Sequence, residues 1–240
     1  LLFACGRPGQ VPRILSARNR AGRAAGAADP YRFRRARPSA APCADRSRVS
    51  QGAGLPADAM KVVLDACVLY PTVLRQILTG VAAGGLITPV WSDRLLEEWA
   101  RTAARRGGAT EEAEARGQIA VLNAQFPEAL TATDPGAEAA LWLPDAGDVH
   151  VLSTAIAVEA ERIVTLNLKD FPRRELAAHG ITADHPDAVL YRLWLDHPGV
   201  IEGVVADTHR AFEAARGVPA DLRSLLKRAQ LPRLGKAVSV

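Results

Sequence analysis

Cysteine is scarce in this 240-residue sequence, and the three that occur, Cys5, Cys43 and Cys67, lie far apart. Such spacing predicts neither a disulfide framework nor a cysteine-based metal site, and it fits a reducing cytoplasm. Long hydrophobic runs are missing as well. Because a membrane-spanning helix needs about 18 or more consecutive apolar residues, the sequence predicts a cytoplasmic protein without a membrane span.

The sequence also lacks the signatures of several common catalytic sites. It contains no glycine-rich phosphate-binding loop, no Gly-x-Ser-x-Gly nucleophile turn, and no pair of histidines or cysteines with metal-binding spacing. P-loop and dinucleotide-binding enzymes, serine hydrolases with that turn, and histidine or cysteine metal sites are therefore disfavoured. The residues left to carry chemistry are carboxylates.

Positive charge is concentrated in one segment. Residues 1–59 contain 11 arginines, no lysine and three acidic residues, a balance of +8, whereas the remaining chain carries −4. The segment is rich in Arg, Ala, Gly and Pro without a regular apolar period, so we expect it to be disordered. Met60 is the only methionine, and a strand-like sequence follows it directly, which favours an over-extended reading frame for residues 1–59. A basic RNA-binding arm and a transit peptide are the alternatives.

From Met60 onward, strand-like and helix-like segments alternate. The apolar run "KVVLD" predicts a buried strand, and "PTVLRQILTGVAAGG" predicts a helix that begins near Pro71. "LITPVW" is a second strand candidate, and Ser92 is the expected cap of a helix in "DRLLEEWARTAAR". Further predicted elements are a polar helix over about 110–124, a short strand in "ALTATDPG", a helix over 149–160, strands in "RIVTLN" and "GITADHP", and helices over about 186–230.

This alternation predicts an α/β protein with a central parallel sheet covered by helices on both faces, which is a three-layer α/β/α sandwich. We divide the chain into the basic segment 1–59, a sheet-containing domain over 60–185, and a helical extension over 186–240.

Several acidic residues lie where the predicted sheet would bring them together. Asp65 directly follows the first strand, and Asn167 and Asp170 follow the apolar run "IVTL". Asp148 opens the helix that precedes the second of these strands. Because the carboxyl ends of parallel strands meet at one edge of a sheet, we expect these side chains to converge.

Glu98 is the fourth candidate acid, and the choice between it and Glu97 depends on helix phase. At about 100° per residue, Glu97 points nearly opposite the apolar stripe of its helix and is expected in solvent. Glu98 lies on the flank of that stripe and can reach a cleft beside the core. The stripe consists of Leu95, Leu96, Trp99 and Ala103.

Each acid also has a purely local explanation. Asp65 and Asp170 could shape turns, Asp148 could cap a helix, and Glu98 could be a solvated surface residue. Convergence favours a site instead, because clustered carboxylates repel one another unless a divalent cation such as Mg²⁺ or Mn²⁺ binds them. Such a centre can activate water for attack on a phosphodiester.

The neighbours of these acids have less defined roles. His150 is expected to face solvent or to support a ligand, rather than to bind a metal itself. Lys169, Arg173 and Arg174 lie beside Asp170, where they could contact a nucleic-acid backbone or form a solvated basic turn.

The chain from Met60 to about 185 resembles the PIN-domain ribonucleases, the family of the VapC-type toxins of toxin–antitoxin pairs. The resemblance rests on "VVLDACVLYP", "SDRLLEEW", "LPDAGDVHVLSTAIA" and "IVTLNLKDFP", in this order and spacing. It implies a PIN-like α/β/α sandwich that cleaves RNA and is inhibited by a small antitoxin protein. It also implies that Asp65, Glu98, Asp148 and Asp170 surround Mg²⁺ or Mn²⁺, with Asn167 in support and Asp145 near the metal.

The helices after residue 186 extend beyond the minimal domain, so they could form a lid, a homodimer surface or a dock for the antitoxin. Two other functions remain open. A haloacid-dehalogenase-like hydrolase also has an Asp after its first strand, although the second Asp of that family is replaced here by Cys67. A PIN-like module that binds without catalysis is the other alternative.

Overall fold

The computed structural model describes residues 59–239, so the expectations for the basic segment 1–59 fall almost entirely outside the described residues. The five strands are β1 (Met60–Leu64), β2 (Ile87–Ser92), β3 (Leu130–Thr131), β4 (Arg162–Val164) and β5 (Thr182–Asp184). The α-helices are α1 (Ala66–Leu69), α2 (Thr72–Ala83), α3 (Asp93–Gln125), α4 (Pro135–Glu138), α5 (Val149–Ala157), α6 (Arg173–Ala177), α7 (Pro186–Asp196), α8 (Pro198–Arg216), α9 (Leu222–Arg228) and α10 (Pro232–Ala237). Three short 3-10 helices are η1 (Pro127–Ala129), η2 (Ala146–Asp148) and η3 (Leu168–Asp170).

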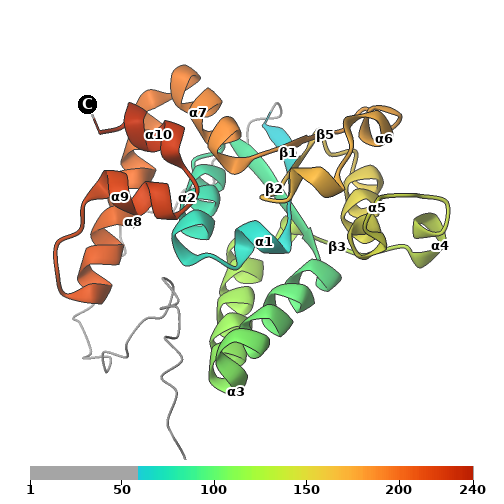
Figure 1. Cartoon of the computed structure of the whole chain (residues 1–240), viewed down its shortest axis with the longest axis horizontal. Coiled ribbons are helices and arrows are strands. Elements are labelled where there is room, and N and C mark those ends of the chain that lie inside the picture. Colours follow the sequence, from blue (N-terminus) through green and yellow to red (C-terminus); the bar gives the residue numbers. More distant parts are fainter. Residues whose placement is uncertain (1–58, 240) are drawn as a thin grey trace, which may run out of the picture. The chain divides into compact units, whose positions relative to one another are not determined.

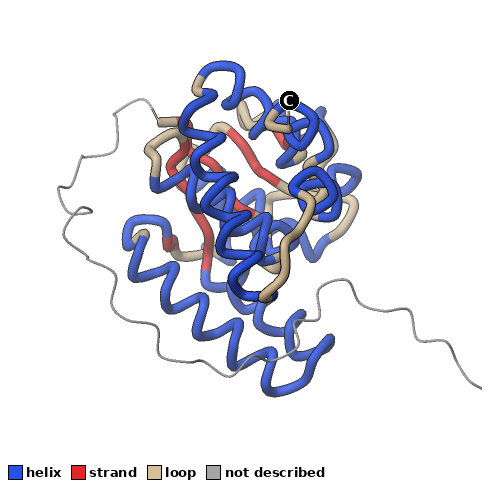
Figure 2. The backbone as a smooth tube through the Cα atoms, turned by 90° about the vertical axis from the view of Figure 1, so that its left-hand side faces the viewer, coloured by secondary structure: helices blue, strands red, loops and turns tan. Residues whose placement is uncertain are grey.

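The five strands form one parallel sheet in the order β3-β2-β1-β4-β5 (Figure 1). Helices flank this sheet (Figure 2), which confirms the predicted α/β class with a central parallel sheet. After β1 the chain adds β2 and β3 on one side, and later β4 and β5 on the other. The sheet order therefore reverses between β1 and β4, which is the place where parallel α/β sheets hold their ligands.

The strands form a sheet at these positions because their side chains are almost continuously apolar. In β1, Val62, Val63 and Leu64 are completely buried, as are Ile163 and Val164 in β4. Such runs are typical of strands covered on both faces. No helix of residues 59–239 has the length and apolar character needed to cross a membrane.

Helix α3 reverses direction near Gly108, whose backbone has φ 73° and ψ −163°. In a continuous helix, residues 19 apart would be separated by about 28 Å along the axis. Yet Arg116 Nη1 donates to Glu97 Oε2 across 3.0 Å, so the two halves of α3 lie side by side. The predicted helices over "DRLLEEWARTAAR" and about 110–124 are thus both present. Ser92 begins the first half and accepts a hydrogen bond from the Leu95 amide, as predicted.

Helix α5 ends at Ala157, three residues before the predicted end at 160. Val158 terminates the helix, and the following residue, Glu159, has a positive φ of 53°. The amide of Ala160 bonds back to the Ala155 carbonyl at 2.8 Å, which closes the helix end. This tight reversal leads directly into β4.

The C-terminal helices contact the domain chiefly through α8, which lies against α2. Ile201 and Val205 on α8 are buried. The approach is close at Gly80 of α2, where an added Cβ would lie 2.6 Å from Val204 Cγ1. Helix α10 is joined to α7 by the buried carboxylate of Asp187.

Candidate metal centre

Asp65 lies at the carboxyl end of β1 and is held by Cys67 of α1 and by Thr165, which follows β4. Its carboxylate is 7% exposed and accepts a hydrogen bond from Thr165 Oγ1 at 2.6 Å. The Cys67 thiol donates to the same oxygen, Oδ2, at 3.0 Å. Thr165 follows β4 just as Asp65 follows β1, and the two strands are hydrogen-bonded neighbours. The sheet itself therefore fixes the Asp65 side chain.

Asp145 and Asp148 bracket the 3-10 helix η2, and their side chains have different local roles. Asp145 Oδ1 accepts from the Gly147 amide at 2.8 Å and so shapes the turn. Asp148 ends η2 and directly precedes α5 at its N-cap position, but its side chain makes no capping hydrogen bond. A purely local capping role for Asp148 is therefore absent, and its carboxylate remains available for a ligand.

Asp170 ends the short helix η3 that follows β4. Asn167 begins η3, and its Nδ2 donates to Asp170 Oδ2. This hydrogen bond orients the carboxylate of Asp170. The next helix, α6, has Pro172 at its N-cap position. Asp170 therefore does not cap that helix.

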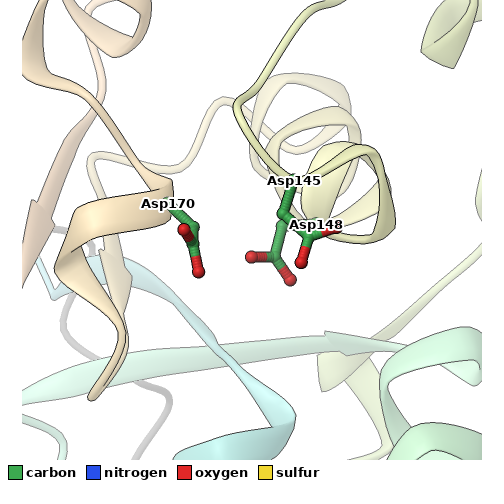
Figure 3. A group of neighbouring side chains, drawn as sticks. All are labelled: Asp145, Asp148 and Asp170. Carbon is green, nitrogen blue, oxygen red and sulfur yellow. The ribbon is translucent and has the colours of Figure 1, made fainter.

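Asp145, Asp148 and Asp170 form a compact acidic triad. Each offers a carboxylate oxygen, and these three oxygens lie within 4.8 Å of one another. Figure 3 shows the side chains of Asp145 and Asp148 facing that of Asp170 across the space between η2 and η3. Oxygen donors at this spacing, and carboxylates in particular, suit Mg²⁺ or Mn²⁺.

Burial raises the pKa of Asp148 to about 6, and the nearby charges of Asp65, Asp145, Asp170 and Glu98 add to the effect in that order. All four predicted ligands and Asp145 therefore act on one electrostatic site. Five carboxylates that repel one another across a half-buried space are a poor arrangement for stability alone. A divalent cation would relieve that repulsion, so the donor set fits the predicted metal.

Glu98 and Glu97 point in different directions, although the side chain of each is 36% exposed. Glu98 approaches α5, where its Oε1 lies 2.8 Å from His150 Nε2. Glu97 points to the surface, in line with the prediction, where it forms ion pairs with Arg101 and Arg116. The ion pair with Arg116 exists because α3 folds back at Gly108. The helix-phase choice of Glu98 as the acid nearer the site agrees with these contacts.

The roles of four residues of this region were not fully predicted from the sequence. Thr165 and Cys67 were not assigned to the site, although Thr165 occupies the same place after β4 that Asp65 occupies after β1. His150 is completely buried, so a solvent-facing position is wrong, and its contact with Glu98 fits the alternative of a supporting role. Asp145, expected only near the metal, belongs to the compact triad.

Residues 61–169 match the sequence model of the family described as PIN domain. This segment is a PIN domain. It contains Asp65, Glu98, Asp145 and Asp148, and the match ends one residue before Asp170. Searches with the whole chain found no matching curated protein and no matching solved structure. PIN domains are typically metal-dependent nucleases, and the acidic triad of this one can bind a metal ion.

The pKa of Asp148 predicts how metal binding depends on pH. Below about pH 6 the carboxyl is protonated, so a cation must displace a proton, whereas above pH 6 the carboxylate is already free. We expect the dissociation constant for Mn²⁺ to rise by about tenfold between pH 7 and pH 5. Titration with Mn²⁺, followed by electron paramagnetic resonance at both pH values, measures this change in the dissociation constant directly. An unchanged dissociation constant would contradict a role for Asp148 as ligand.

Proposed function

We propose that the protein is a metal-dependent endoribonuclease that hydrolyses RNA phosphodiester bonds with Mg²⁺ or Mn²⁺. The observation that carries this proposal is the compact triad of Asp145, Asp148 and Asp170 in a PIN domain. The catalytic acids are Asp65, Glu98, Asp148 and Asp170, and the supporting residues are Asp145 and Asn167.

In this proposal, each side chain has a separate task. When bound, a divalent cation would lower the pKa of a coordinated water molecule and stabilise negative charge on the phosphate. Asp148 and Asp170 would hold the cation together with Asp145, whose hydrogen bond from the Gly147 amide fixes its orientation. Asp65 is kept rigid by Thr165 and adds negative charge from the strand end. Glu98 contributes charge from the opposite side, on α3.

RNA binding by a mildly acidic body requires a local basic surface. Lys169, Arg173 and Arg174 are exposed beside Asp170, and within residues 59–239 none of them pairs with a carboxylate. We assign these three side chains to contacts with RNA phosphates near the cleavage site. Because each such contact releases a counterion, affinity for RNA should fall with added salt.

We further propose that the nuclease acts as the toxin of a toxin–antitoxin pair and that a small antitoxin protein inhibits it. Similarity to the VapC-type toxins in the four quoted stretches supports this role. The helical extension α7–α10 offers a surface for the antitoxin or for a second copy of the chain. Growth arrest on expression, relieved by the product of a small neighbouring gene, would identify the partner.

Metal removal is the most direct test of the proposed activity. We expect the full-length protein to cut single-stranded RNA internally in Mn²⁺ or Mg²⁺, and to lose this activity by at least about 100-fold in EDTA, since the carboxylates alone cannot activate water. Gel analysis of a labelled oligoribonucleotide measures the loss, and added Mn²⁺ should restore cleavage.

Parallel reactions decide between the proposed activity and its two alternatives. Hydrolysis of p-nitrophenyl phosphate without RNA cleavage would indicate the dehalogenase-like hydrolase. Binding of RNA without any turnover, in several metals, would indicate a silent PIN-like module. Cleavage that persists in EDTA would contradict the metal-dependent mechanism.

A further inference from the structure

His150 is a buried polar side chain that the mechanism above does not use. It lies on α5, two residues after Asp148, and is completely buried. Its Nε2 is 2.8 Å from Glu98 Oε1, but the contact is not aligned as a hydrogen bond. Within residues 59–239, neither ring nitrogen has an aligned hydrogen-bond partner.

Packing alone does not account for an imidazole at this position. A buried polar atom without a hydrogen bond costs about 1–3 kcal/mol, whereas an apolar side chain of similar size would carry no such cost. The flanking core positions on the helix, Val151 and Leu152, are apolar and buried. The polar ring therefore matters for what it contacts, and that is Glu98.

Two side chains, His150 and Arg94, compete for the same oxygen of Glu98, Oε1. His150 approaches from the protein interior at 2.8 Å, and Arg94 Nε approaches from the solvent side at 3.9 Å. Arg94 is 45% exposed and also bonds Glu138 of α4 at 3.0 Å. Without His150, the attraction of Glu98 Oε1 to Arg94 would be unopposed, and the carboxylate would no longer be held against α5.

Asp148 directly precedes α5 and His150 lies in its first turn, so one short stretch of chain carries a candidate ligand and the side chain that contacts Glu98. The contact with Glu98 then ties α3 to α5 across 52 residues of sequence.

The geometry points to His150 as a positioning residue that holds Glu98 Oε1 and directs this carboxylate toward the metal centre. The positioning role of His150 rests on the proposed function only in that Glu98 is assigned to that centre. In metal sites, side chains that orient the ligands typically change metal affinity by about 10-fold to 100-fold when they are replaced.

The test compares two amides of different length in the full-length protein. In His150→Gln the amide nitrogen replaces Nε2, whereas in His150→Asn it replaces Nδ1 and cannot reach Glu98. At a fixed pH of 7.5, we expect the Mn²⁺ dissociation constant of His150→Asn to rise by about tenfold and that of His150→Gln by less than about threefold. Electron paramagnetic resonance of free Mn²⁺ gives both constants without any RNA.

A double-mutant cycle separates positioning from a loss of packing. If His150 acts through Glu98, then His150→Asn should have no further effect on Mn²⁺ affinity in a Glu98→Gln background. Ser153→Ala, which changes another buried polar residue of α5, should leave the affinity unchanged. Circular dichroism establishes that each variant is folded, and the more conservative Gln variant keeps the comparison decisive if Asn disrupts packing.

Three outcomes would overturn the inference. These are equal affinities for the Gln and Asn variants, an undiminished effect of His150→Asn in the Glu98→Gln background, and a wild-type protein that binds no Mn²⁺. A wild-type protein that binds Mn²⁺ but cuts no RNA would refute the proposed nuclease, while the affinities would still decide the role of His150.

Discussion

Replacing Asp148 by asparagine should abolish metal-dependent cleavage and, at the same time, raise the melting temperature of the metal-free protein. Asparagine has nearly the same shape, but it removes one negative charge from the centre of the cluster. We expect cleavage in Mn²⁺ to fall by at least about 100-fold, which corresponds to about 2.7 kcal/mol in the activation free energy. Initial rates on a labelled oligoribonucleotide measure this loss.

The gain in stability follows from the sign of the pKa shift. The pKa of Asp148 is raised in the folded protein, so ionising it opposes folding above about pH 6, and this penalty disappears as the pH falls toward the ordinary value of 3.8. Because Asp148 is only half-buried, solvent screening reduces the penalty to the order of 1 kcal/mol. At pH 7.5 in EDTA, Asp148→Asn should therefore melt about 3 °C above the wild type. The difference should shrink at pH 5.

Asp134→Asn provides a matched control for this experiment. Asp134 begins α4 and accepts from the Gly136 amide at 2.8 Å, a turn of the same kind as the one formed by Asp145. Because it lies outside the acidic triad, its replacement should change neither cleavage nor the pH dependence of melting. Retained cleavage in Asp148→Asn, or a lower melting temperature without metal, would contradict the assignment of Asp148 to a metal centre in which the carboxylates repel one another.

The sheet, and the places of Asp65, Asp148 and Asp170 relative to it, could be predicted because they depend on short-range patterns. The short, largely apolar segments "VVL" and "IVTL" marked β1 and β4, and the parallel arrangement then required Asp65 and Asp170 to meet at one edge. The position of Asp148 followed from the start of α5. For these residues, sequence position relative to a strand or helix end was sufficient.

The remaining contacts depend on chain reversals and packing that no local pattern records. The ion pair between Glu97 and Arg116 was not predicted, because it depends on the chain reversal at Gly108, 11 residues further along the chain. His150 was not expected to be buried because α3, which covers it, is distant in sequence. Asp145 entered the triad because η2 turns its side chain back toward Asp148, a detail of 3-10 geometry.

Removing the Asp187 carboxylate should produce the largest loss of stability outside the central sheet. Asp187 is 5% exposed at the start of α7, and its two oxygens accept from the Arg233 and Leu234 amides, each at 3.0 Å. Helix α10 begins after Leu231, whose apolar side chain cannot cap it, so Asp187 supplies the cap from a distant helix. Asp187→Ala would leave two amides without acceptors, at a cost of about 3 kcal/mol in the free energy of unfolding.

Urea unfolding followed by circular dichroism measures this cost, and Asp196→Ala is the control. Asp196 is an exposed acid at the other end of α7, so its loss should change stability by less than about 0.5 kcal/mol. Limited proteolysis should locate new cleavage of Asp187→Ala in α9 and α10, because the cap joins α10 to α7. If the extension only buttresses the domain, the Mn²⁺ affinity of Asp187→Ala should equal that of the wild type below the unfolding transition. A loss of Mn²⁺ affinity in the folded variant would instead mean that the C-terminal helices act on the metal centre, and equal stability losses for the two alanine variants would refute the capping role.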